Sequence, residues 1–146
     1  MPNMSNELEN KLLDFLFRGQ PFPQIQSIYV AMFTTKPTDA EPGAEPAAPS
    51  YGRAAITCNL NAWSATNAPD SRAVSTGSSG TTYNIEEIKF PDPEQDWGNI
   101  RYIGLFDAPA GGTYLYWSEL TNPRDFIIGD VNIKFRAGEL SVQIDN

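Results

Sequence analysis

Proline is the feature that most limits how this chain can fold. It accounts for 12 of the 146 residues, against roughly 5% in average proteins. Inside a helix, proline removes a hydrogen bond and clashes with the preceding turn. Long helices are therefore excluded over most of the chain, and short strands joined by turns are expected. The length fits one domain with one hydrophobic core.

One helix is expected at the start of the chain. Four apolar residues follow helical spacing there: Leu8, Leu12, Phe15 and Leu16. Asn6 with Glu9 three residues later is typical of a helix N-terminus, and Gly19 can end the helix in a left-handed conformation. We expect a helical segment over residues 1–19 and a β domain over 20–146. The apolar stripe could dock on a partner subunit or lie on the chain's own sheet, and both alternatives stay open.

The rest of the chain shows short apolar and aromatic runs bounded by turn residues. The runs predicted as strands are Ile25–Thr34, Tyr51–Asn59, Tyr83–Phe90, Ile100–Phe106, Thr113–Leu120, Phe126–Ile128, Val131–Phe135 and Leu140–Ile144. Gly111-Gly112 predicts a hairpin. In the last run, Leu140, Val142 and Ile144 are expected to face inward. The pattern favours a mainly β fold, an antiparallel β-sandwich or jelly roll with the helix at one end or edge.

Two segments are expected to be exposed loops. Ala40–Ser50 consists mostly of Ala, Glu, Pro and Gly, and Ser64–Thr82 is rich in Ser, Thr and Gly. Neither has the apolar residues to pack a core, and loops of this length are often functional.

Several classes of function are disfavoured by composition. The chain has no histidine and one cysteine, Cys58, which excludes histidine-dependent triads, histidine-ligated zinc and an internal disulfide. A formal net charge of -8 disfavours binding to nucleic acid or an anionic membrane. No apolar stretch approaches the ~20 residues of a membrane span, and the polar start, Met1–Asn10, predicts no targeting segment. No cofactor is expected.

Acidic residues offer two candidate chemistries, and neither is predicted. Asp92–Asp96 carries alternating carboxylates like the opening of a calcium loop, but Trp97 and Ile103 stand where that loop needs glycine and glutamate. Carboxylate pairs for glycoside hydrolysis could come from Glu86, Glu87, Asp96, Asp107 or Glu119. With 18 acidic residues, some suitable pair is expected by chance. We expect no metal site and no enzyme.

Aromatic residues could form a surface that stacks on sugar rings. Most are expected in the core, since Tyr29, Tyr102 and Tyr116 lie inside predicted strands, whereas Trp63 and Trp97 lie on predicted loops and are candidate exposed contacts. Arg53 is expected to pair with an acidic neighbour, as is Arg101.

A series of motifs resembles one known group of proteins. The motifs are Leu8-Glu9-Asn10-Lys11-Leu12-Leu13-Asp14 leading to Arg18-Gly19, Ile28-Tyr29-Val30-Ala31-Met32-Phe33-Thr34-Thr35 with Pro37-Thr38-Asp39, Tyr51-Gly52-Arg53, Asp96-Trp97-Gly98, Tyr102-Ile103-Gly104-Leu105-Phe106-Asp107, Gly111-Gly112, Leu115-Tyr116, Gly129-Asp130 and Phe135-Arg136-Ala137-Gly138-Glu139-Leu140. Their order resembles small virion proteins of tailed bacteriophages, often labelled phage tail fibre protein.

The resemblance implies a non-enzymatic structural protein of the virion, made in the host cytoplasm. Similar small β-rich modules also act as capsid decoration or cement proteins, so a position on the tail or on the head surface stays open. Other virion proteins are the implied partners, and a closed homo-oligomer, with a trimer as the working expectation, follows from particle symmetry. The alternative function is a carbohydrate-binding module for host cell-surface glycans that uses Trp63 and Trp97.

Overall fold

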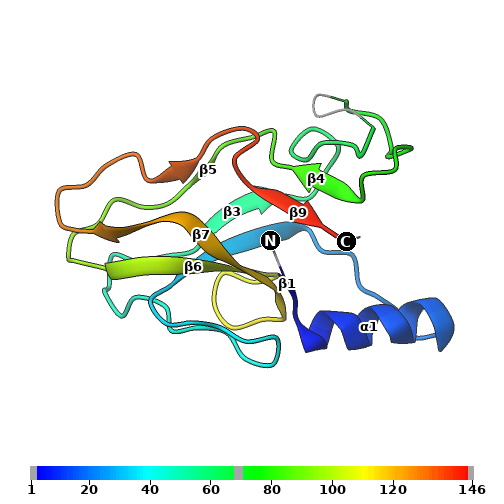
Figure 1. Cartoon of the computed structure of the whole chain (residues 1–146), viewed down its shortest axis with the longest axis horizontal. Coiled ribbons are helices and arrows are strands. Elements are labelled where there is room, and N and C mark those ends of the chain that lie inside the picture. Colours follow the sequence, from blue (N-terminus) through cyan, green and yellow to red (C-terminus); the bar gives the residue numbers. More distant parts are fainter. Residues whose placement is uncertain (1–2, 68–70, 145–146) are drawn as a thin grey trace.

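Five antiparallel strands form the central sheet, in the order β1-β7-β6-β2-β3 (Figure 1). The computed structural model describes residues 3–67 and 71–144. The elements are β1 (Asn3–Met4), α1 (Asn6–Phe17), β2 (Ser27–Phe33), β3 (Ala54–Thr57), β4 (Thr81–Tyr83), β5 (Ile88–Lys89), β6 (Gly98–Phe106), β7 (Tyr114–Phe126), β8 (Lys134–Phe135) and β9 (Ser141–Gln143). The mainly β class and the single N-terminal helix are confirmed. Opposite the sheet lie two short ribbons, β4 with β9 and β5 with β8, rather than one continuous second sheet.

Most predicted strands are present, with changed ends. β6 and β7 form the predicted hairpin, and Gly111 and Gly112 both adopt positive φ at its tip. The predicted strand Phe126–Ile128 is wrong, because β7 continues through Pro123 and ends at Phe126. Ile144 is exposed rather than inward, because β9 ends at Gln143.

Side chains alternate across the central sheet and build two cores. One face carries Val30, Met32, Ile103 and Leu105, which pack with residues of the ribbon layer, among them Ile88, Phe90, Ile133 and Leu140. The opposite face carries a smaller, largely aromatic cluster: Ala31, Phe33, Phe106 and Tyr114, flanked by Tyr29, Tyr102 and Trp117.

Gly104 makes room for the centre of the aromatic cluster. It pairs with Ala31 across β6 and β2, and the fully buried Phe33 ring lies directly over it. A Cβ atom at position 104 would lie 2.5 Å from Phe33 Cε2 and 3.4 Å from Phe106 Cε2, so the two buried rings leave no room for it.

Gly104→Ala should therefore lower the free energy of unfolding by about 1–3 kcal/mol, the usual cost of overpacking a core. Urea denaturation gives the value. Gly52→Ala is the matched control, because a Cβ atom there would meet Pro91 at an ordinary 3.8 Å. Equal stability losses in the two variants would contradict this explanation.

The loop after β2 is exposed at most positions of Ala40–Ser50, as predicted, but part of it packs against the protein, so the prediction that it cannot pack a core is wrong. Pro46 is buried, and Gly43 lies against Phe33. The loop is fastened where Thr34 N donates to Ala44 O and Ala44 N donates to Thr35 Oγ1, each at 2.8 Å. The loop therefore covers the aromatic cluster. In the second predicted loop, Ser64–Thr82, Ser64 is buried and residues 68–70 lie outside the described part of the chain.

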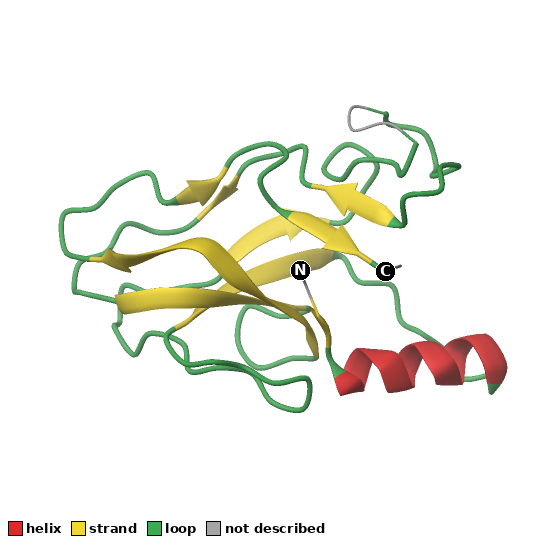
Figure 2. Ribbon diagram, viewed as in Figure 1, coloured by secondary structure: helices red, strands yellow, loops and turns green. Residues whose placement is uncertain are grey.

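Helix α1 projects from one end of the sheet (Figure 2). Its N-cap is Ser5 rather than the predicted Asn6, since Ser5 Oγ accepts from Leu8 N. Ser5 is fully buried, donates from its hydroxyl to Tyr114 O and from its amide to Leu115 O, and so joins the helix start to β7. Gly19 adopts positive φ after the helix, as predicted. The division into segments 1–19 and 20–146 stays a prediction, and residues 1–2 and 145–146 lie outside the described chain.

Candidate functional site

The predicted apolar stripe of α1 divides into a packed half and an exposed half. Leu8 is buried and Leu12 is half-buried against the main core. Beyond them the helix leaves the sheet, and its apolar side chains are open to solvent. We call this surface the helix end, and it consists of Leu13, Phe15, Leu16 and Phe17. Leu16 is 64% exposed and Phe17 is 78% exposed. The Phe15 ring and the Phe22 ring meet in an edge-to-face arrangement, with 6.1 Å between ring centroids.

A second exposed apolar surface follows β7. We call it the isoleucine turn, and it consists of Ile127, Ile128 and Val131, all exposed. Its backbone is tightly held: Ile127 N donates to Asp130 Oδ2 at 2.9 Å, and Ile128 N donates to Asp96 Oδ1 at 3.0 Å. The turn therefore presents three aliphatic side chains on an ordered backbone. The sequence did not indicate this surface, because Ile127 and Ile128 lie within the predicted strand Phe126–Ile128 and Val131 within the predicted strand Val131–Phe135.

Trp97 is buried, so its predicted role as an exposed aromatic contact is wrong. It is 3% exposed, and its indole nitrogen donates to Ser50 Oγ at 3.1 Å. Its ring lies edge-on to Tyr51, with 5.4 Å between centroids, and near Phe126. The cause is pairing with β7, because Trp97 N donates to Phe126 O and turns the side chain inward. Trp63 is half-buried and packs against the same core.

The acidic candidates are placed mainly in structural contacts. Asp96 holds the isoleucine turn, Asp107 accepts from Thr113 N in the β6–β7 hairpin, and Glu87 pairs with Lys134 at 3.1 Å. Glu119 lines the groove described below. Within residues 3–67 and 71–144, no three carboxylate or cysteine side chains gather in a way that could hold a metal ion.

A groove of about 630 Å³ runs between β7 and the strands β8 and β9. Its floor is apolar and includes Met32, Ile103 and Leu105. Its rim is polar or charged and includes Asn122, Arg124, Asn132, Arg136, Glu139 and Gln143. One wall is a β-bulge, because residues 120–123 of β7 stand opposite the single residue Arg101 of β6. Bulges redirect side chains in this way near binding sites.

A buried ion pair holds the loop after β2 against the β6–β7 hairpin. Arg53 binds Glu45 through two nitrogens, at 2.8 Å and 3.0 Å, which confirms the predicted acidic partner. Its Nη1 donates to Ala108 O and Gly111 O, and its guanidinium lies 3.7 Å from the Phe106 ring centroid. Arg101, in contrast, is exposed and makes no ion pair within the described residues.

Tyr51 and Glu45 complete this network. Tyr51 Oη donates to Glu45 Oε1 at 2.6 Å and accepts from Met32 N. Burial by itself would raise the pKa of Glu45, but the hydrogen bonds from Arg53 and Tyr51, together with the Arg53 charge, outweigh it and lower that pKa from 4.5. Burial and the hydrogen bond to Glu45 raise the pKa of Tyr51. The network therefore favours ionised Glu45 and neutral Tyr51, a structural arrangement that fixes the loop.

A family model described as Podophage GP4 fiber I protein gp80 matches residues 3–143. The matched range includes α1, the central sheet and both ribbons. No curated protein matches the chain. Among the described residues, no helix is long and apolar enough to cross a membrane.

Proposed function

Because the chain belongs to the podophage GP4 fiber I protein gp80 family, we propose that it is a structural component of a phage fibre and acts through contacts with other virion proteins. Membership of a phage fibre family confirms the resemblance drawn from the sequence and makes the protein a component of the virion. The proposal adds how the protein acts: it has no enzymatic role and works through contacts made by its surface.

The observation that carries this proposal is the exposed helix end. Isolated apolar residues are common on protein surfaces, but clustered ones mark interaction sites. Leu13, Leu16 and Phe17 lie on one short helix that extends beyond the sheet. The net charge of -8 is consistent with an exterior position, because packaged DNA would repel it.

A position on the head surface and a closed trimer are two more specific possibilities within this proposal. A decoration or cement role would use the same exposed surfaces on the capsid. The closed trimer stays a prediction from particle symmetry, and native mass spectrometry of the purified protein would read the copy number directly.

The location can be tested on intact particles. We expect an antibody against this protein to label fibres in electron micrographs, and mass spectrometry of purified virions to find it. Labelling spread over the head would favour decoration instead. Absence from purified virions would overturn the proposal, with the major capsid protein as the positive control.

A second candidate function is glycan binding, and the groove between β7 and β9 favours it. Amide, hydroxyl and charged side chains over an apolar floor are the usual composition of a small-molecule site. Titration calorimetry with host polysaccharide should then show binding that Asn122→Ala weakens and Trp63→Ala leaves unchanged. No heat of binding, or a loss caused by Trp63→Ala alone, would contradict a site in this groove.

A further inference from the structure

We propose that part of the loop after β2 acts as a strap that helps to fix the direction of α1, with the Glu45–Arg53 ion pair as its latch. The strap consists of residues 37–46. When the latch is broken, the strap and the start of α1 separate while the central sheet stays folded. The inference rests on the proposed function, because it names what sets the direction of the helix end, the surface through which the protein is proposed to act.

One end of the strap holds the start of α1. The first four N–H groups of a helix have no acceptor within that helix, and here Asn6 N donates to Asp39 O of the strap at 2.8 Å. β7 holds the same strap residue, because Trp117 Nε1 donates to Asp39 Oδ1 at 2.8 Å. Beside it, Tyr114 Oη donates to Thr38 O at 3.0 Å. Asp39 therefore joins the strap to both α1 and β7.

The other end of the strap is fastened by the carboxylate of Glu45. Arg53 binds it at 2.8 Å and 3.0 Å, and Tyr51 Oη donates to it at 2.6 Å. The Arg53 side chain is 6% exposed, and it also donates to Ala108 O and Gly111 O between β6 and β7. Loss of the Glu45 charge would leave Arg53 unpaired in a mostly buried site, which disfavours the closed strap.

Little slack separates the latch from Asp39. Five residues lie between Asp39 and Glu45. The ring of Pro42 fixes one φ angle, and Gly43 lies so close to Phe33 that a Cβ atom on it would be 2.8 Å from Phe33 Cβ. A short, stiff and closely packed segment passes a displacement from one end to the other. Movement at Glu45 therefore reaches Asp39.

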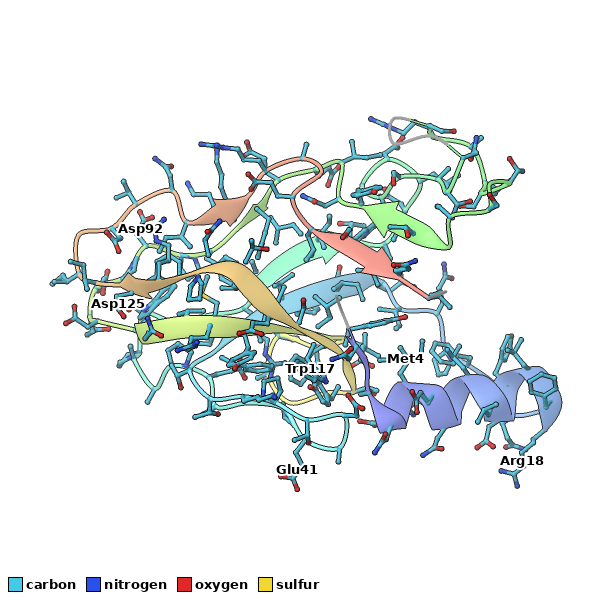
Figure 3. The ribbon with its side chains drawn as sticks, in the orientation of Figure 1. Met4, Arg18, Glu41, Asp92, Trp117 and Asp125 are labelled. Atoms are coloured by element: carbon cyan, nitrogen blue, oxygen red, sulfur yellow. The ribbon has the colours of Figure 1, made fainter. Side chains whose placement is uncertain are left out.

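Few buried side chains hold the strap. Only Pro37 and Pro46 of its ten residues are buried, and Figure 3 shows Glu41 pointing away from the sheet. Segments with few buried apolar contacts open at a lower free energy than the whole protein. The strap is therefore expected to open while β2 and β6 stay paired.

Ser5 keeps α1 attached when the strap opens. Its hydroxyl donates to Tyr114 O, and its amide donates to Leu115 O at 2.8 Å. Neither bond involves the strap. Loss of the contact with Asp39 therefore leaves α1 joined to β7 at Ser5 and removes one of the bonds that fix the direction of the helix.

Hydrogen exchange of the purified protein, measured residue by residue by NMR, tests this inference. The reporters are the Ala44 amide on the strap, the Asn6 amide of α1 and the Trp117 indole N–H. Glu45→Gln should make all three exchange at least ~10-fold faster and by one common factor, because a broken buried pair is costly and the three bonds open together. Glu41→Gln, at an exposed position of the same strap, should leave their exchange unchanged.

A second variant perturbs the strap without touching the latch. Gly43→Ala places a Cβ atom against Phe33, so it should also make the three reporters exchange faster by a common factor. Gly52→Ala is its control, since a Cβ atom there makes an ordinary contact with Pro91. This pair of variants decides the question if Glu45→Gln does not fold.

Ile88→Val separates opening of the strap from unfolding of the whole protein. Ile88 is fully buried in the main core, which lies on the opposite face of the sheet from the aromatic cluster that the loop covers. The variant weakens the folded sheet whether the strap is open or closed. It should therefore make amides in the middle of β2 and β6 exchange faster and leave the three reporters unchanged.

Three results would overturn the inference. Unchanged reporters in Glu45→Gln would show that the ion pair is not a latch. Faster exchange at Ala44 alone, with Asn6 and Trp117 unchanged, would show that the latch does not reach the helix. Reporters that respond to Ile88→Val would show that the strap opens only when the whole protein unfolds. All these results concern purified protein, so they leave the virion location intact, whereas absence from virions would remove the proposed function and leave the strap unaffected.

Discussion

Arg53→Met should lower the free energy of unfolding by about 3–5 kcal/mol, the usual effect of breaking a buried ion pair from one side. The Arg53 side chain is 6% exposed. Its loss leaves Glu45 without a counter-charge and removes the donor to the Ala108 and Gly111 carbonyl oxygens. Methionine fills part of the space over Phe106 and cannot make these bonds. Urea denaturation gives the difference in free energy.

Arg18→Met is the control for this prediction. It makes the same substitution in an ion pair with Asp14 whose arginine side chain is 72% exposed, where such pairs contribute about 0.2–0.5 kcal/mol. Similar losses in the two variants would show that the buried network is unimportant.

The pH dependence of stability gives a second readout of the Arg53 network. The pKa of Glu45 is lowered in the folded protein, so its stabilising contribution is present above the ordinary value of 4.5 and is lost as the pH falls through the folded value. Wild type should lose that contribution in acid, and Arg53→Met should show a shallower loss. An unchanged acid dependence in Arg53→Met would contradict the assigned cause.

Trp97→Ala should lower the free energy of unfolding by about 3–5 kcal/mol, as expected when a buried tryptophan is truncated. The substitution removes ring contacts with Tyr51 and Phe126 and leaves a cavity between the loop after β2 and the end of β7. It also removes the donor to Ser50 Oγ. Thermal or urea unfolding measures the loss.

Trp63→Ala serves as the comparison for Trp97→Ala. Trp63 is half-buried, so its truncation should cost clearly less. Unchanged stability in Trp97→Ala would contradict the buried position of that side chain.

Local patterns predicted the parts of the fold that depend on neighbouring residues. The helix, the Gly111-Gly112 hairpin and the strands β2 and β6 follow from spacing and turn residues within a few positions. The identity of the N-cap was wrong by one residue, because Ser5 is chosen by its bonds to Tyr114 and Leu115, more than 100 positions away.

The candidate surfaces depend on longer-range pairing and were harder to predict. Pro123 argues against a strand, yet β7 runs through it to Phe126, and that extension buries Trp97 while it exposes Ile127 and Ile128. The ribbon layer likewise joins residues 45 to 62 positions apart. The groove beneath the bulge follows from these pairings, so composition and periodicity alone gave no sign of it.

The position of the hydrogen bonds that attach α1 determines how far the exposed end of the helix can move. The hydrogen bonds that join the helix to β7 and to the loop after β2 lie at residues 5–7, whereas Phe17 stands about 18 Å further along the axis. A tilt of about 10° at this pivot displaces the far end by roughly 3 Å. A virion partner bound at the far end of α1 would therefore be able to move by this amount while the hydrogen bonds at the start of the helix stay formed.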